Sequence, residues 1–178
     1  FAKLEVLFKW LRLFYPQAGG MHILQLAICF FPQKILRING KVPWPVHFTS
    51  TVLFPENITV GNRAELGFMP NCYINAENGI KVGHNVRMGP GVKIVSTKDE
   101  TENSHQDLPI RIGNNVWIGM NTILLSGIEI GDNVIISSNS VVYKNISPNS
   151  IAAGDPCRVI RKKSPYLGKD YGEVTRHE

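Results

Sequence analysis

Aliphatic side chains recur at every sixth position through the second half of this chain, and glycine follows many of them. One register contains Val82, Met88 and Ile94, followed by Ile112, Ile118, Leu124, Ile130, Ile136 and Val142. This spacing is neither the 3.6-residue period of an α-helix nor the two-residue alternation of a half-buried strand. It predicts a parallel β-helix, in which each six-residue unit forms one short strand and one corner. The aliphatic side chains then stack inside, and glycine permits the tight backbone of the corners.

The repeat is weaker at its beginning, where the same spacing joins Val60, Leu66 and Cys72. Between Cys72 and Val82 the register shifts by four positions, and the turn-like residues 76–79 would absorb this shift.

A polar segment, residues 96–109, interrupts the repeat without changing its register, since Ile112 continues the phase of Ile94. The segment therefore leaves the β-helix at a corner and returns in step. A solvated loop without a role is one interpretation. A long irregular excursion from a regular scaffold is more often functional, and His105 gives this one an imidazole.

The N-terminal part carries apolar residues at helical spacing. We expect one amphipathic helix over 1–15, ended by Pro16, and a second within the apolar interval 21–36 that ends near Pro32. The two helices would cap the open end of the β-helix; the alternative is contact of residues 1–37 with a membrane surface, because basic residues flank the apolar face. The sequence thus divides into a helical appendage (1–39), an extended linker (40–57), the β-helix with its excursion loop (58–163) and a polar tail (164–178).

Composition limits the classes of partner. The net charge of +5 and the pI of about 9.2 suit phosphorylated cofactors or membrane surfaces. No helix-turn-helix, zinc-finger or aromatic-basic pattern supports nucleic-acid binding. The three cysteines have neither metal-binding nor redox spacing, and no apolar run reaches transmembrane length. We therefore expect a cytoplasmic protein, either free or peripheral to the inner face of the membrane.

Three segments carry a family resemblance: 111–119 (RIGNNVWIG), 128–135 (IEIGDNVI) and 152–160 (AAGDPCRVI). Through them the β-helix resembles the hexapeptide-repeat acyltransferases, within them the galactoside and maltose O-acetyltransferase branch. The resemblance implies a left-handed, all-β parallel β-helix and a homotrimer with active sites between neighbouring subunits. The stretch 43–47 (PWPVH) looks more like bacterial acyltransferases of polysaccharide synthesis.

The resemblance also implies a reaction, the transfer of an acetyl group from acetyl-CoA to a sugar hydroxyl. The hydroxyl needs a general base, and the resembling enzymes place theirs in the loop that holds His105. Many relatives carry the base in an Asn-His-Asp triplet, where this chain has Thr97, Lys98 and Asp99. Of the other histidines, we interpret His22 and His47, which lie outside the repeats, as structural, while His177 lies in the tail. We interpret His84, at a corner of the repeat, as a solvated or neighbour-bonded corner residue.

The remaining site residues follow from the same resemblance. Arg158 matches a coenzyme-binding arginine, and its guanidinium suits the phosphates of coenzyme A. The amide of Met120 is the expected oxyanion donor. The pantetheine arm would run along Gly119, Met120, Ser138, Tyr143 and Lys144. Asn75 is the candidate for the acceptor sugar, and Trp117 is expected to pack at the edge of the β-helix or shape the cleft. For residues 161–163, phosphate contacts and a solvated basic tail are equally good interpretations.

Three other functions are alternatives. A γ-type carbonic anhydrase needs three histidine ligands for zinc, and the sequence offers only His84 and His105 in the right region, so no metal is expected. A non-catalytic β-helix scaffold would fit the missing triplet. An acetyltransferase for serine or an antibiotic is the third alternative, although serine acetyltransferases have a larger helical N-terminal domain.

Overall fold

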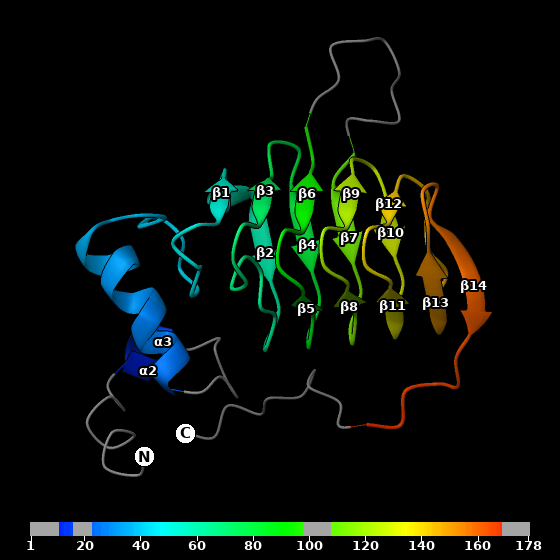
Figure 1. The fold of residues 1–178 in the computed structure, drawn as a ribbon, viewed down its shortest axis with the longest axis horizontal. Helices are drawn as coiled ribbons and strands as arrows, with labels where there is room; N and C mark the ends of the chain where they lie inside the picture. The colour runs from blue at the N-terminus through cyan, green and yellow to red at the C-terminus, as the bar shows by residue number, and fades with distance from the viewer. Residues whose placement is uncertain (1–10, 16–22, 98–107, 169–178) are drawn as a thin grey trace.

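The computed structural model describes residues 11–15, 23–97 and 108–168, which form a three-sided parallel β-helix with helices at one end (Figure 1). The three faces are parallel sheets, here named A, B and C. Sheet A contains β1 (Thr51–Leu53), β3 (Tyr73–Asn75), β6 (Lys93–Val95), β9 (Ile123–Leu125) and β12 (Val141–Val142). Sheet B contains β2 (Ile58–Val60), β4 (Ile80–Val82), β7 (Ile110–Ile112) and β10 (Glu129–Ile130). Sheet C contains β5 (Arg87–Met88), β8 (Trp117–Ile118), β11 (Val134–Ile136), β13 (Ser150–Ala153) and the antiparallel β14 (Arg158–Lys162).

The residues of the six-residue repeat stack in register inside the three sheets. In sheet A, Ile94 pairs with Leu124, which pairs with Val142 in the next coil, and all three are fully buried. Corresponding rows fill the inner sides of sheets B and C, so that one continuous apolar core runs along the axis. The predicted parallel β-helix is therefore confirmed.

The corners explain why glycine follows the aliphatic residue. A Cβ at Gly119 would lie 2.3 Å from the amide nitrogen of Ser138 in the next coil, and one at Gly131 would lie 2.7 Å from the nitrogen of Pro148. Neither glycine has a positive φ; close approach of the next coil's backbone requires them. Asparagines take the left-handed conformation at the corners instead: Asn85, Asn115, Asn121, Asn133, Asn139 and Asn149. Asparagine tolerates this conformation better than most residues with a side chain.

The coils are longer at the N-terminal end of the β-helix than at the C-terminal end. From Leu124 to its partner Val142, the coil consists of three six-residue units, one for each face. The coil from Val52 to its partner Ile74 and the coil from Ile74 to Ile94 both exceed this length. The turn at 77–78 takes up extra residues in the second coil, as the register shift predicted.

The helical appendage packs one side of its helices on the first coil. α2 (Leu11–Phe14) and α3 (Ile23–Phe30) are followed by a five-residue π-helix, η1 (Phe31–Ile35). Leu26 and Cys29 are buried in a cluster with Tyr15 and Phe68. The α-helix ends at Phe30, near Pro32 as expected. The chain continues through Pro32 in a wider turn, in which the Leu36 amide reaches the Phe31 carbonyl at 3.3 Å. A π-turn shifts hydrogen bonds by one residue and so accommodates a proline that would break a regular helix.

Buried Gln33 fixes this appendage to the segment that follows it. Its amide donates to the carbonyl oxygens of Val42 and Trp44, each at 2.8 Å, and its oxygen accepts the Tyr15 hydroxyl at 2.8 Å. The indole of Trp44 donates to the Leu66 carbonyl at 2.9 Å. Within the expected linker, Thr51–Leu53 forms β1 and pairs with β3, so this part contributes a strand to the β-helix. Among the described helices, none combines the length and the apolarity needed to cross a membrane.

Candidate active site

The edge between sheets C and A brings together three of the predicted site residues. Gly119 and Met120 follow β8, and Ser138 occupies the corresponding place one coil later, after β11. The Asn139 amide donates to the Met120 carbonyl at 2.8 Å, which ties the two coils at this corner. The Met120 side chain is 49% exposed, so the edge is open to solvent.

The backbone at this edge is closely layered. The Gly119 amide donates to the Ile136 carbonyl at 2.8 Å, and the next coil continues with the Val141 amide bonded to the Gly154 carbonyl at 3.1 Å. Since neighbouring strands lie roughly 4.8 Å apart, the edge runs about 10 Å along the axis from Met120 to Gly154. Met120, Ser138 and Gly154 are exposed along it, and they form a surface on which an extended ligand can lie.

Arg158 lies at the C-terminal end of this edge. It is the first residue of β14, pairs in register with Ala153 and is exposed. A cis peptide bond between Asp155 and Pro156 and a bond from the Cys157 amide to the Val141 carbonyl, at 2.9 Å, shape the connection that leads to it.

The ammonium groups of Lys162 and Lys163 both donate hydrogen bonds to side chains of the β-helix. The Lys162 ammonium donates to the Ser147 and Ser150 hydroxyls at 2.6 and 3.1 Å. The Lys163 ammonium donates to the Asn133 side-chain oxygen at 2.7 Å, and burial lowers its pKa. Both lysines thus bind side chains of the β-helix, which is a third possibility beside phosphate contact and a solvated tail.

A second edge, between sheets A and B, contains three other predicted site residues: Tyr143, Lys144 and Asn75. Tyr143 and Lys144 directly follow β12, and the Lys144 ammonium lies 6.0 Å from the centre of the Tyr143 ring. Asn75 ends β3, three coil steps or roughly 14 Å away along the axis. Its carbonyl accepts the Ser96 amide at 2.8 Å, so Asn75 adjoins the point where the excursion loop leaves the β-helix.

The predicted base, His105, lies outside the described residues, as do 98–107 in general. Of the other histidines, His84 Nδ1 accepts the Asn62 amide at 3.0 Å across neighbouring coils. Such a neighbour-bonded corner residue is what the sequence interpretation of His84 expected. His47 Nδ1 accepts the Thr49 amide at 3.2 Å, and burial lowers the His47 pKa. In the described part of the chain, no three His, Cys, Asp or Glu side chains gather as a metal site.

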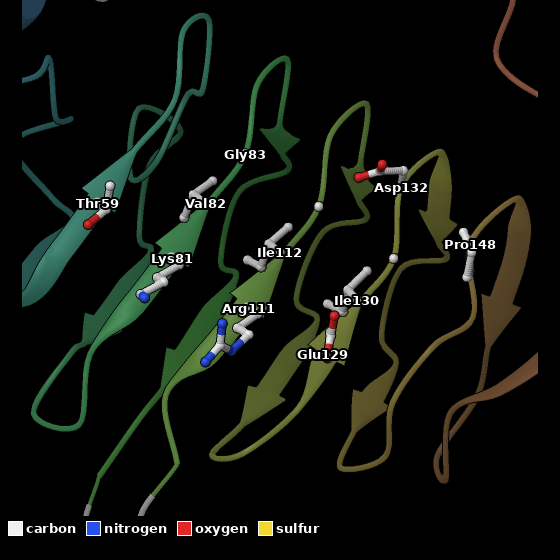
Figure 2. A pocket seen from close by; sticks show the side chains of 12 residues that line it. Thr59, Lys81, Val82, Gly83, Arg111, Ile112, Glu129, Ile130, Asp132 and Pro148 are labelled. Carbon is white, nitrogen blue, oxygen red and sulfur yellow. The ribbon is translucent and has the colours of Figure 1, made fainter. Parts of the chain in front are cut away.

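Sheet B carries an open groove of about 510 Å³ that the sequence interpretation missed (Figure 2). Thr59, Lys81, Arg111 and Glu129 lie in register on the outer side of β2, β4, β7 and β10. Within the described residues, neither Lys81 nor Arg111 has a carboxylate oxygen at ion-pair distance. The signal was present in the sequence, because each of these polar residues directly precedes an inward aliphatic residue. None of the predicted site residues lines this groove.

Trp117 lies on the outer side of sheet C and is 46% exposed. It lines a shallow groove of about 360 Å³ together with Ile135, Lys163 and Tyr166. The groove also contains Arg87, whose Nε lies 3.8 Å from a Glu65 oxygen. Burial raises the pKa of Glu65, and the charge of Arg87 opposes this effect. Trp117 therefore shapes a surface rather than filling the core.

Known proteins share both the sequence pattern and this fold. Residues 109–144 match the pattern described as bacterial transferase hexapeptide (six repeats). The galactoside O-acetyltransferase of Escherichia coli strain K12 is 36% identical over 143 residues, which cover 75% of this chain and 68% of that protein. This chain belongs to the hexapeptide-repeat acetyltransferases. More closely, it is a member of the galactoside and maltose O-acetyltransferase type, the acetyl-CoA-dependent sugar O-acetyltransferases.

Two solved structures of hexapeptide-repeat acetyltransferases support the assignment. A maltose O-acetyltransferase from Clostridium difficile 630 is 36% identical with a TM-score of 0.56, over 65% of this chain and 64% of the other. A galactoside acetyltransferase in complex with coenzyme A is 33% identical with a TM-score of 0.51, over 69% and 68% of the two chains. The chain thus spans about two thirds of the length of these relatives.

Proposed function

We propose that this hexapeptide-repeat acetyltransferase moves an acetyl group from acetyl-CoA to a hydroxyl of a sugar or saccharide precursor. One observation carries the proposal. The residues matched to the coenzyme site, from Met120 through Ser138 to Arg158, follow one exposed edge of the β-helix in axial order. A galactoside acetyltransferase of this type binds coenzyme A, which supports acetyl-CoA as the co-substrate here.

The two ends of this edge suit the two ends of coenzyme A, with Arg158 toward its phosphates and Met120 toward its thioester. The exposed Arg158 guanidinium has no partner among the described residues, so it can donate to a phosphate group. The small, exposed Ser138 lets an extended pantetheine arm approach this edge closely. The thioester would then lie at the Met120 end of the edge. Tyr143 and Lys144 face a different edge and would contact the arm only where it crosses the end of sheet A.

The residues divide the reaction between them. The His105 imidazole takes the proton of the acceptor hydroxyl while the hydroxyl oxygen forms a bond to the thioester carbonyl carbon. The Met120 amide donates to the carbonyl oxygen as negative charge develops on it. The carbon–sulfur bond then breaks, and the protonated His105 returns its proton to the departing thiolate. The products are an O-acetyl ester and free coenzyme A, with His105 neutral again.

We propose further that the active unit is a homotrimer. The edge that carries Met120 and Ser138 is convex and open in one chain, whereas a reaction of this kind needs a cleft that excludes water. A neighbouring subunit would close such a cleft. Sheet A offers an apolar outer side for this contact, including Ile123, Leu125 and Val141.

In the homotrimer, the acceptor would lie where the excursion loop of one subunit leaves its β-helix, against the Met120 edge of a neighbouring subunit. Asn75 adjoins the base of this loop, and its side-chain oxygen already accepts the Glu77 amide at 3.2 Å. Its side-chain NH₂ group therefore remains to bind an acceptor hydroxyl. Serine or an antibiotic would be acetylated by the same chemistry, so a panel of acceptors must include both.

The test is release of free thiol from acetyl-CoA by the full chain with a panel of sugars, sugar nucleotides, serine and an aminoglycoside. The His105→Ala variant should bind acetyl-CoA normally and lose about 100-fold or more in kcat, because general-base catalysis contributes roughly 10²–10⁴-fold. Arg158→Ala should weaken coenzyme binding by roughly 10- to 100-fold, since a hydrogen bond to a charged group is worth about 1.5–3 kcal/mol. Lys81→Ala, on sheet B, is the matched control and should change neither value.

The outcomes separate the alternatives. If the parent chain does not bind acetyl-CoA, the β-helix serves as a scaffold and the proposal fails. If it turns over acetyl-CoA and His105→Ala is equally active, another group is the base. If only serine or the aminoglycoside is acetylated, the sugar acceptor is wrong while the reaction class stands.

A further inference from the structure

The N-terminal helices have a second side that the β-helix does not cover. Their inner side is fixed by the buried cluster of Tyr15, Leu26 and Cys29 against Phe68. On the outer side, seven large apolar side chains are between 40% and 82% exposed: Leu13, Phe14, Ile28, Phe31, Ile35, Leu36 and Ile38. Exposed apolar patches of this kind mark interaction surfaces in soluble folds.

Three of these side chains share one side of the helix. Ile28, Phe31 and Ile35 follow one another at spacings of three and four residues through α3 and η1, which places them on one side of the helix. The Phe14 ring of α2 packs edge-on against Phe30 of α3, with ring centres 5.2 Å apart. We call the seven apolar residues, with Lys34, Arg37 and Lys41 beside them, the N-terminal face.

The charge around the N-terminal face is of one sign. Between Glu5 and Glu56 the sequence contains no acidic residue, while it has five basic ones: Lys9, Arg12, Lys34, Arg37 and Lys41. These five side chains equal the net charge of +5 of the whole chain. The remainder of the chain therefore carries as many acidic as basic residues, and the positive excess lies in the N-terminal third of the sequence.

We propose that the N-terminal face docks on an anionic lipid bilayer, so that the β-helix stands on the membrane by the end opposite Arg158 (Figure 1). Apolar side chains on one side of a helix with basic residues beside them are the features that place a helix in the lipid interface. Anionic headgroups complement the positive charge, as they do for polybasic segments. A twofold contact with a second copy of this chain fits less well, because it would bring the same basic residues together.

Docking needs no change in the fold. Gln33 holds the segment through hydrogen bonds of 2.8 Å to Tyr15, Val42 and Trp44. Lys34 adds a cation–π contact, its ammonium 5.4 Å from the centre of the Tyr15 ring. The apolar side chains are thus presented by a helix that is already anchored on its other side, which lowers the conformational cost of binding.

The test is co-sedimentation of the full chain with vesicles of phosphatidylcholine alone and with vesicles in which a third of the lipid is phosphatidylglycerol. Binding to the anionic vesicles should be at least about tenfold stronger, since each basic residue near such a surface adds roughly fivefold to the partition coefficient. High salt should remove most of this difference. The double variant Phe31→Glu with Ile35→Glu should lower binding to anionic vesicles roughly tenfold or more.

Two controls keep the result interpretable. Leu167→Glu places the same charge at a 94% exposed leucine outside the N-terminal face and should bind as the parent does. Thermal unfolding of the double variant should stay close to that of the parent, because both replaced side chains are more than half exposed.

Three results would overturn the proposal. The first is no binding to either vesicle, and the second is equal binding to neutral and anionic vesicles. The third is a change of oligomeric state in the double variant without lipid, measured by sedimentation velocity, which would make the N-terminal face a subunit interface.

Discussion

Leu124 lies in the middle of the β-helix, and its replacement by alanine tests whether the stacked rows hold the fold together. The side chain is fully buried and lies in register between Ile94 of the previous coil and Val142 of the next. Leu→Ala removes the equivalent of three methylene groups, which is worth about 2.4 kcal/mol at roughly 0.8 kcal/mol each. The neighbours belong to hydrogen-bonded strands and cannot close the hole fully, so a cavity cost is added and the loss should reach about 3–5 kcal/mol.

The measurement is urea unfolding followed by circular dichroism, at one protein concentration, with thermal unfolding beside it. For a chain of this length the loss corresponds to a decrease in Tm of roughly 6–20 °C, at about 2–4 °C per kcal/mol. Leu167→Ala is the matched control, since the same atoms are removed from a side chain that is 94% exposed, and it should cost less than about 0.5 kcal/mol. A loss below about 1 kcal/mol for Leu124→Ala would refute the reasoning, because the stacked row would then contribute little.

Two further predictions concern titratable groups. Burial raises the pKa of Cys29 to about 11 and also raises the pKa values of Cys72 and Cys157. Because the three thiols are buried and protonated at pH 8, the folded protein should resist a thiol reagent that labels all three cysteines in urea. Rapid labelling of Cys29 alone would show that the contact between α3 and the first coil opens easily. Burial lowers the pKa of His47 below its usual 6.5, so protonation of His47 favours the unfolded chain. The stability that neutral His47 contributes is present above pH 6.5 and is lost as the pH falls through the lowered pKa. The decrease in Tm from pH 7.5 to 5 should therefore be smaller in His47→Gln than in the parent, and equal decreases would contradict this assignment.

Much of the fold could be predicted because one period carries it. Where a coil consists of three six-residue units, every sixth side chain points inward. The positions of Leu124, Ile130 and Ile136 therefore predict one strand on each of the three faces. The first coil is longer, and its extra length hides the period; Val52 of β1 therefore looked like part of a linker. The α-helix ends near Pro32 as predicted, because a proline normally ends a helix, but the π-helical turn over Phe31–Ile35 that follows has no sequence signal here.

The site was less accessible to this reasoning. Met120 and Ser138 occupy corner positions, where the repeat constrains the backbone and leaves the side chain free, so only the resemblance drew attention to them. The row of Lys81, Arg111 and Glu129 was readable in principle from the residue before each inward aliphatic one. The hydrogen bonds of Lys162 to Ser150 and of Lys163 to Asn133 join segments that are 12 and 30 residues apart in the sequence, and no local pattern reveals them.

The final strand has a consequence for how the molecule behaves in solution. A stack of parallel coils exposes unpaired backbone groups at its last rung, where another chain could add strands as in a fibril. β14 turns back antiparallel along β13 and covers that edge of sheet C, and all five of its residues are exposed, with Arg158, Arg161 and Lys162 among them. Charged residues on an outermost strand discourage further strand addition. Arg158, which we assign to the coenzyme, therefore also belongs to the strand that ends the stack of coils. This strand hinders end-to-end association of one molecule with another.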